Sequence, residues 1–387
     1  MFTSQILPIL KWRIRRPMNF RVPIKFDPRY GRLTAIQSSS KDLTIQRYKY
    51  KLKCILPILY TLTLAINLIF GSFSTVQRLQ GAVFLMLCVL TSTAGWNCGV
   101  APVQVVNTFL DFETDFPTLE SCMGVRIMKY FICLAEVSII GFAILQLLLL
   151  TFVPCTAPFV LSMLPICKNF QDVNDNWAWP NVPVRMVVHL VETWLGYDTM
   201  YTCGFGILYV LFGGIACLLG YISHMEKKIR ASANISQMGK IISLYQRILL
   251  VEKSFNNFIK NQILPGLIFC AVVLEVLALY VCIELHRQVE MPGFLIFPMV
   301  MVDSVLTNLL VLTLASYVDK NSKNALSNLT RKLVHIRGRT DRAIAQRRLR
   351  SCPSLKVRIW MNFVDRLTPL IAQTFCINQT VSLIMIK

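Results

Sequence analysis

The amino-acid sequence predicts an all-α, polytopic membrane protein with seven transmembrane helices, a cytosolic N-terminus and an extracellular C-terminus. Hydrophobic residues fill 55% of the 387 positions, the mean hydropathy is +0.54, and charged residues account for 16%, whereas soluble domains contain about 25% charged residues. Several apolar stretches reach the roughly 20 residues that a helix needs to cross hydrocarbon. Basic residues gather at alternate connections between these stretches, which predicts the orientation.

The predicted spans are apolar runs separated by turns or polar loops. Pro57 stands in the first turn of span one, where its missing N–H is tolerated. The second half of span two, STAGWNCGVAP, and the glycines of span four are small residues that permit close helix contact. The seven spans are expected at residues 54–73, 81–106, 127–153, 202–222, 263–284, 294–317 and 367–387.

The connections between the spans differ in character. The N-terminal tail is basic and interrupted by prolines, the outer loop is proline-rich, and an amphipathic helix at 185–201 leads into span four. The two later basic segments have apolar residues at helical spacing, so we expect helices to continue from spans four to seven into the cytosol. The resulting segments are the cytosolic tail 1–53, spans one to four 54–222 with the outer loop 154–184, a cytosolic helical segment 223–262, spans five and six 263–318, the basic cytosolic segment 319–366 and span seven 367–387.

The distribution of charge predicts the topology. Of the 40 Lys and Arg, 35 lie in the tail or in the connections after the second, fourth and sixth spans. Basic residues are enriched on the cytosolic side of membrane proteins, so the N-terminus is expected inside and, with seven spans, the C-terminus outside. This placement also explains the net charge of +20: basic residues beside the cytosolic ends of helices set the topology and attract anionic membrane lipid. No separate basic domain suggests nucleic acid as a partner.

Three acidic residues stand within predicted spans: Glu136, Glu275 and Asp303. A charge in hydrocarbon costs about 2.5–3.5 kcal/mol on insertion scales. Each residue either faces a polar ligand pocket or cation path inside the bundle, or is a protonated carboxyl bonded to a neighbouring helix. Trp194, on the amphipathic helix before span four, is a further pocket candidate. No Lys or Arg stands in the middle of a span as counter-ion, which disfavours a proton-relay antiporter.

The last span carries more polar residues than a lipid-facing anchor needs. Thr374, Asn378 and Ser382 share one helical stripe, Gln373 and Thr380 share another, and Gln379 lies beside the first. One stripe can bond to neighbouring helices while the other lines an aqueous path. The alternative is that both stripes only join helices, as small polar residues often do in membranes.

The cysteines and motifs suggest neither a cofactor nor an enzyme. Thirteen cysteines are scattered, mostly in spans, without C-x-x-C pairs or metal-ligand spacing. Cys155 and Cys167 both lie in the outer loop, and extracellular cysteines usually oxidise, so a disulfide between them is one possibility. The sequence lacks the G-x-S-x-G, H-E-x-x-H and P-loop patterns of hydrolases, metalloproteases and nucleotide-binding proteins.

The layout resembles the arthropod seven-transmembrane chemoreceptor superfamily, the insect-type gustatory and odorant receptors. The resemblance is strongest in YQRILLVEKSFNNFIKNQILP (Tyr245–Pro265) and in the final NFVDRLTPLIAQTFCINQTVSLIMIK. Gustatory members usually carry Thr-Tyr, five apolar residues and Gln-Phe in the last helix. Here Thr374-Phe375 matches the opening, and Val381-Ser382 stands where Gln-Phe is usual.

This resemblance implies a ligand-gated, non-selective cation channel of the plasma membrane that responds to a small-molecule tastant or odorant. It implies a homo- or hetero-tetramer in which the last helix of each subunit lines a central pore. The ligand pocket would lie in the outer half of spans two to six. No cofactor is implied.

The resemblance also assigns roles to two sets of residues. In a symmetric tetramer only one stripe of the last helix faces the axis, and we expect Gln373 with Thr380, together with Gln379 near the outer end. Thr374, Asn378 and Ser382 would then bond to neighbouring helices. The helical segments in the cytosol would form an anchor between subunits, with aromatic and aliphatic contacts. The expected anchor residues are Trp360, Phe363, Leu249 and Phe255.

Two other function classes are alternatives to a chemoreceptor. A G-protein-coupled receptor also has seven spans, but it requires the opposite orientation, and its usual Asp/Glu-Arg-Tyr and Asn-Pro-x-x-Tyr motifs do not occur. A small-solute transporter often shows a repeat between its halves, and none is evident here. Accessibility of the termini on intact cells distinguishes the first alternative from a chemoreceptor.

Overall fold

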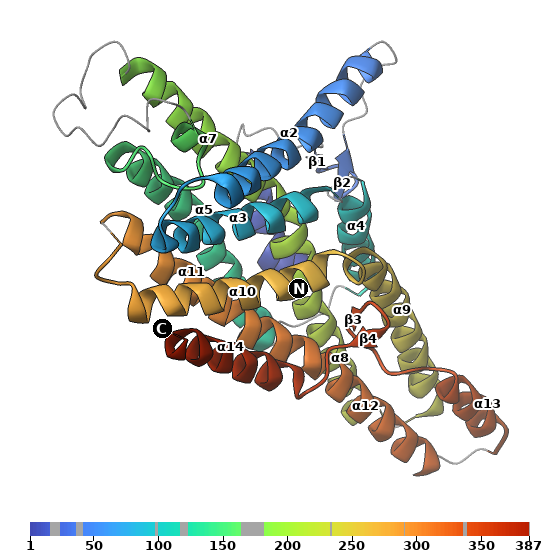
Figure 1. Cartoon of the computed structure of the whole chain (residues 1–387). Helices are drawn as coiled ribbons and strands as arrows, with labels where there is room; N and C mark the ends of the chain where they lie inside the picture. The colour runs from blue at the N-terminus through green and yellow to red at the C-terminus, as the bar shows by residue number, and fades with distance from the viewer. Residues whose placement is uncertain are drawn as a thin grey trace.

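The structure, a computed structural model, describes residues 1–15, 24–35, 42–96, 100–116, 123–163, 182–232, 234–289, 291–335 and 339–386. This described part is a bundle of long helices with two small antiparallel hairpins (Figure 1). The hairpins pair β1 (Ile24–Asp27) with β2 (Arg32–Ala35) and β3 (Arg358–Ile359) with β4 (Asn362–Phe363). The predicted all-α class is confirmed.

Five helical runs among the described residues are long and apolar enough to cross a membrane. Three of these runs are single helices: α3 (Thr75–Trp96), α5 (Met123–Phe152) and α10 (Ile263–Glu284). The other two runs consist of several consecutive elements. One is formed by α7 (Val182–Gly204), η4 (Phe205–Phe212) and α8 (Gly213–Ala231). The other is formed by η5 (Gly293–Leu295), α11 (Ile296–Leu306), η6 (Thr307–Val311) and α12 (Leu312–His335). A polytopic membrane protein is thereby confirmed.

Two further helices occupy the places of the first and last predicted spans. In α2 (Asp42–Phe70) the apolar part is the shorter stretch Cys54–Phe70. Pro57 therefore lies inside a helix that begins well before the predicted span, rather than in its first turn. The C-terminal helix α14 (Thr368–Met385) starts with Pro369, where the missing N–H costs no helical hydrogen bond.

The run α7–η4–α8 forms the centre of the bundle. The predicted amphipathic helix and span four are continuous in it, and the most apolar 18-residue window of this run is entirely buried. Glycines in this run let neighbouring side chains pack directly against its backbone. A Cβ at Gly214 would lie 2.5 Å from the ring of Phe255 on α9 (Ile235–Ile259). The middle part, η4, is a π-helix, a geometry that often marks functional sites.

The first fifteen residues pack inside the bundle instead of lying as a tail beside the membrane. They form η1 (Phe2–Ile6) and α1 (Leu7–Arg15), and Phe2, Ile6 and Leu10 are completely buried. A sequence rich in basic residues and proline gave no indication of this insertion. A terminus is ordered only where other groups hold it, and the contacts of the two helices with the rest of the bundle do so here.

The carboxylate of Glu113, on α4 (Ala101–Asp115), holds the start of this segment. Backbone N–H groups of Phe2 and Thr3 donate to it over 2.6 and 2.9 Å, and the Met1 ammonium lies 2.9 Å away. Burial by itself raises the pKa of Glu113, but the ammonium and these N–H donors outweigh it, so the pKa lies below its usual value. The Tyr221 hydroxyl on α8 donates to the same carboxylate over 3.0 Å.

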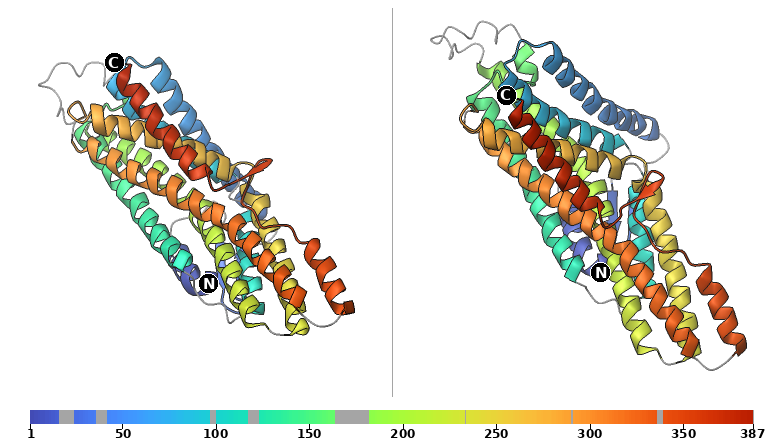
Figure 2. Two further views of the ribbon diagram at one scale, coloured as in Figure 1. Left: turned by 90° about the horizontal axis from the view of Figure 1, so that it is seen from below. Right: turned by 60° about the horizontal axis from the view of Figure 1, so that its bottom comes forward.

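At one end of the bundle, helices continue beyond the apolar spans (Figures 1 and 2). We call this part the helical extension; it consists of α4, the end of α8, α9, the end of α12 and α13 (Arg339–Arg350). Its core includes Phe109, Tyr245 and Phe255, each fully buried. Figure 2 shows that the C-terminal end of α14 lies at the opposite end of the molecule.

The segment that joins α13 to α14 is extended rather than helical. The spacing of Ile359, Trp360, Phe363 and Val364 predicted a helix, and this prediction is wrong, because residues 358–363 form the β3–β4 hairpin. Trp360 sits in the turn with a φ of 48°. The hairpin is attached to the end of α9, since Trp360 N–H donates to the Lys260 carbonyl over 2.9 Å and the indole N–H donates to the Asn261 carbonyl over 3.0 Å.

Candidate ligand cavity and pore helix

A partly open cavity of about 170 Å³ lies among the spans and is lined by α3, α5, the α7–η4 run, α10, α11 and η6. Apolar side chains dominate its wall, including the aromatic rings of Phe131, Phe142 and Phe212. An engineered cavity of about 150 Å³ in another protein binds benzene, so this volume suits a small organic molecule. An apolar cavity with a few polar groups is the usual form of a ligand site.

Asp303 is the one acidic residue among the described residues that line this cavity. Its carboxylate accepts a hydrogen bond from the Ser138 hydroxyl over 3.2 Å. Of the four residues predicted for a pocket or an intramembrane polar site, only Asp303 lines the cavity. Trp194 does not, because its side chain points out of the bundle and is 54% exposed.

Glu136 lies behind the cavity and is paired. Its carboxylate forms an ion pair with the Arg13 guanidinium, and the Tyr209 hydroxyl donates to it over 2.8 Å. Arg13 has no exposed surface, donates also to the Tyr201 carbonyl, and stacks 4.1 Å from the Tyr201 ring centroid. The counter-ion that seemed absent from the spans therefore comes from the N-terminal segment.

Gly204 separates this ion pair from the cavity. It lines the cavity, and a Cβ at this position would lie 2.8 Å from Nη2 of Arg13. The absence of a side chain lets the guanidinium pack directly against the helix backbone at the junction of α7 and η4. The N-terminal segment thus supports the cavity wall from behind.

Glu275 joins three helical elements. Its Oε2 atom accepts from the Asn308 amide on η6 over 2.7 Å and from the Gln373 amide on α14 over 3.2 Å. Glu275 is 1% exposed and Asn308 likewise. Because α10 and α11–η6 also line the cavity, this cluster, which we call the Glu275 node, connects the cavity wall to the last helix.

Glu275→Leu should destabilise the protein by about 1–3 kcal/mol, because it leaves the buried Asn308 amide without its acceptor. The measurement is the thermal unfolding of the detergent-solubilised protein. Glu275→Gln is the matched control, because it keeps an oxygen acceptor at the same place, and it should unfold nearer to the wild type. Equal stability of Glu275→Leu and Glu275→Gln would contradict the node.

Two of the three residues expected to face the pore axis pack on their own bundle: Thr380 is only 4% exposed, and Gln373 bonds to Glu275. The third, Gln379, is exposed. Between Gln373 and Thr380, Cys376 is fully buried, with its sulfur 3.9 Å from the Val272 carbonyl. The surface-exposed face of α14 instead carries Thr374, Asn378, Gln379 and Ser382.

The predicted anchor residues divide into two groups. Phe255 is fully buried within its own subunit, against Phe109 and Gly214, and Leu249 packs on the same core. Phe255 therefore has no exposed surface to offer another subunit, whereas Leu249 is partly exposed, and its anchor role stays a prediction. Trp360 and Phe363 lie on the exposed hairpin, with 65% and 36% of their surface accessible.

The predicted disulfide falls partly outside the described residues. Cys155 takes part in a disulfide, and Cys167 lies outside the described residues, so their pairing stays a prediction. Among the described residues no group of His, Cys, Asp and Glu has the arrangement of a metal site.

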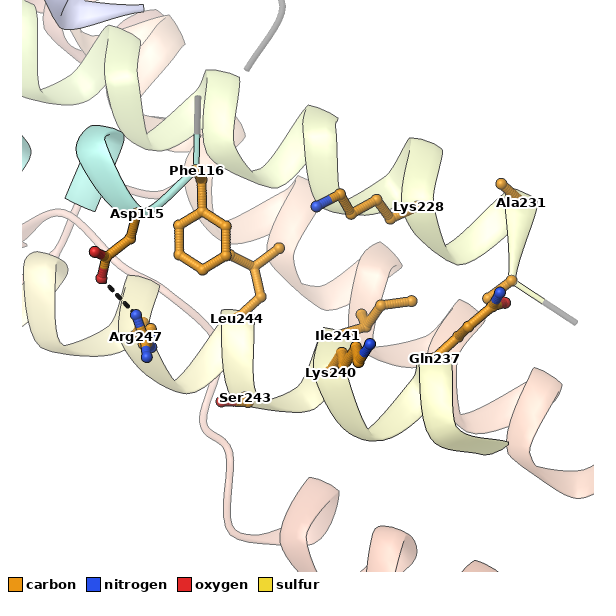
Figure 3. Close-up of a pocket in the computed structure, with 11 residues that line it drawn as sticks. Asp115, Phe116, Lys228, Ala231, Gln237, Lys240, Ile241, Ser243, Leu244 and Arg247 are labelled. Atoms are coloured by element: carbon orange, nitrogen blue, oxygen red, sulfur yellow. Dashed lines mark hydrogen bonds and ion pairs between the residues drawn. The ribbon is translucent and has the colours of Figure 1, made fainter. Parts of the chain in front are cut away.

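A larger hollow of about 710 Å³ lies on the helical extension (Figure 3). Lys228 and Arg247 lie 5.7 and 5.6 Å from the centroid of the Phe116 ring there, Lys240 lies further along the wall, and Arg247 pairs with Asp115 over 2.5 Å. Both members of that pair are more than half exposed, so it contributes little stability. This hollow lies between α8 and α9, outside the apolar spans, and it contains no residue predicted for a site.

Sequence reasoning missed Arg13 and Tyr209. Arg13 is one of thirteen basic residues in the tail, and nothing in the local sequence sets it apart. A signal for Tyr209 was present, since a tyrosine in the middle of a span needs a partner for its hydroxyl. Asn308 stood out as a polar residue within span six, but the sequence did not show that it bonds to Glu275.

The architecture has counterparts among solved structures, although no family model and no curated protein matches the sequence. A structure of the insect olfactory receptor OR5 from Machilis hrabei in complex with eugenol superposes with a TM-score of 0.60 at 13% identity, over 99% of this chain and 98% of the receptor. A further structure of OR5 gives 0.57 at 13% identity, over 99% and 100%.

The chain has the fold of an insect olfactory receptor. The resemblance stated from the sequence is confirmed at this level. The match extends over almost the whole of both chains, so the N-terminal segment, the spans and the helical extension all belong to the shared architecture.

Proposed function

We propose that this protein is a chemosensory receptor of the plasma membrane that acts as a ligand-gated, non-selective cation channel. The observation that carries the proposal is the Glu275 node, which links the wall of an internal cavity to a last helix with a polar outer face. The complex of OR5 with eugenol supports a small organic molecule as the ligand class. Neither alternative function class gains an observation of its own.

The pore of the proposed channel lies on the axis of a tetramer, between the exposed faces of four α14 helices. Thr374, Asn378 and Ser382 supply polar atoms to this face, while Ile371 and Met385 supply apolar surface. Rings of neutral oxygen atoms hold cations weakly enough for conduction. This assignment replaces the earlier preference for Gln373 and Thr380, which are occupied by contacts within the subunit.

Ligand binding opens the channel in this proposal by favouring one packing of α10 and α11 over another. A ligand shifts such an equilibrium only by its difference in affinity between the two states. The Glu275 node places an amide of α14 on a carboxylate of α10, so a shift of α10 is passed to the last helix. The π-helical η6, which supplies Asn308, is a second element that can change its packing.

The decisive test is to record currents from cells expressing this chain during exposure to a panel of small organic compounds. The expected result is a reversible, cation-carried current with at least one compound. Topology is tested in the same cells with an epitope inserted after Asn234, between α8 and α9, because Met1 is only 4% exposed and a tag there would disturb the core. This epitope should require permeabilisation for labelling, and one at the C-terminus should not.

Labelling in the reverse pattern would contradict the proposal and favour the G-protein-coupled receptor alternative. Correctly oriented surface protein that gives no current with any compound, alone or with a co-expressed channel subunit, would contradict the channel function itself.

Trp360→Ala should weaken subunit assembly, because an exposed tryptophan on a hairpin beside α14 is a surface suited to a subunit contact. Met361, next to it, is fully exposed as well. We expect the mutant to shift from tetramer towards smaller species in size-exclusion chromatography with light scattering. Trp194→Ala is the matched control, since Trp194 has a similar exposure but lies on α7. A tetramer unchanged by Trp360→Ala would contradict this contact.

A further inference from the structure

The cavity among the spans combines one carboxylate with aromatic and aliphatic walls, and this combination specifies a ligand class. We propose that the cavity binds small, single-ring amines in their protonated form, with the ammonium group on Asp303. This inference names the ligand class of the channel proposed above, although binding itself does not depend on conduction.

The charge of the cavity is the first argument. None of the described residues that line it is Lys, Arg or His. The other two acidic residues that the sequence singled out already have partners, since Glu136 is paired with Arg13 and Glu275 accepts hydrogen bonds from two amides. Among the described residues, the Asp303 carboxylate accepts a hydrogen bond from the Ser138 hydroxyl and has no basic partner. Asp303 is only partly exposed. A carboxylate that is largely removed from water is costly without a cation, and a ligand ammonium supplies that cation.

The positions of the remaining polar groups are the second argument. Val300, Asp303, Ser304 and Thr307 all line the cavity, at the spacing of one helical face. An ammonium group has three N–H donors. The carboxylate takes one or two of them, and the hydroxyl oxygens of Ser304 and Thr307 lie on the same face to accept others.

The shape and the aromatic lining are the third argument. Phe131 on α5 and Phe212 on η4 lie with ring centroids 5.2 Å apart, and Phe142 completes the aromatic part of the wall. Aromatic rings attract cations through their faces and pack well on a ligand ring. The volume of about 170 Å³ suits a ligand with one ring and a short chain.

The test compares two probes of the same size, 2-phenylethylamine and 2-phenylethanol, which differ in carrying an ammonium or a hydroxyl group. Binding is measured with the purified full-length protein in nanodiscs, by calorimetry or ligand-induced thermal shift. We expect the amine to bind roughly ten- to a hundredfold more tightly than the alcohol, the range of a charge-assisted hydrogen bond. Asp303→Asn should remove this preference, because both probes then meet a neutral side chain.

Two controls keep the inference falsifiable. Ser138→Ala removes the neighbour of the carboxylate but not its charge, so it should keep the preference for the amine. The wild-type comparison needs no variant, so a misfolded Asp303→Asn would not obscure the result. Equal affinities of the wild type for both probes, or an amine preference that survives in folded Asp303→Asn, would overturn the inference.

The outcome is separable from that of the proposed function. Asp303-dependent amine binding without any current would support the ligand class and count against the channel. Currents evoked by neutral compounds, from a protein that does not prefer the amine, would support the channel and overturn the ligand class.

Discussion

Arg13→Leu is expected to keep most of the protein from reaching the cell surface, because it leaves Glu136 buried without its cation. Removing one partner of a buried ion pair costs about 3–5 kcal/mol. Native proteins are stable by only roughly 5–15 kcal/mol, so this loss is a large part of the total. The Tyr209 hydroxyl remains as a donor to the carboxylate, but it does not neutralise the charge.

The measurement is the fraction of expressed protein that is labelled at the surface, together with the unfolding temperature of the solubilised protein. Arg15→Leu is the matched control, since Arg15 is on the same helix but exposed, and it should behave as the wild type. The double variant Arg13→Leu with Glu136→Leu should recover much of the loss, because replacing both charges by apolar side chains is often neutral or stabilising. A wild-type level of stable Arg13→Leu would show that the N-terminal segment contributes little to the fold.

Asn378→Lys is expected to reduce the cation current by more than about tenfold without reducing the amount of surface protein. Asn378 lies at the centre of the exposed face of α14, so in the proposed tetramer four ammonium groups would stand at the pore axis. Two unit charges 4 Å apart interact by about 4 kcal/mol at an effective dielectric constant of 20, which exceeds the 1.4 kcal/mol of a tenfold change. The measurement is the whole-cell current normalised to surface labelling.

Cysteine accessibility tests the same face without adding charge to the resting protein. A thiol reagent applied from outside should reduce the current of Asn378→Cys. Thr380→Cys is the matched control, two residues away but facing the bundle with 4% exposure in the wild type, and its current should not change. Modification of Thr380→Cys together with an inert Asn378→Cys would restore the face originally predicted from the sequence.

The membrane class and the approximate places of the helices were predictable because the bilayer imposes a length and a polarity on each span. The continuation of helices beyond the apolar spans was predictable from the helical spacing of residues such as Ile248 and Phe255. The same spacing misled at Trp360 and Phe363, where the chain forms a hairpin. There the hydrogen bonds to the end of α9 decide the backbone conformation, and these partners are distant in sequence.

The candidate site was predictable only as a set of residue types. Glu136, Glu275 and Asp303 stood out because a carboxylate in hydrocarbon needs an explanation. Their three different surroundings did not follow from the sequence. One pairs with an arginine more than a hundred residues away, one accepts from two amides, and one faces a cavity.

By itself, the sequence determined the all-α membrane class, the run of apolar helices and the concentration of polar residues in the last helix. These follow from composition and from the period of the helix, which are local properties. Only the tertiary structure decided that the N-terminal segment enters the bundle, that Arg13 neutralises Glu136, and that Asn378 rather than Thr380 faces outward. The helical period groups residues into stripes but leaves the rotation of each helix open, and that rotation is set by packing against neighbours that the chain brings together only when it folds.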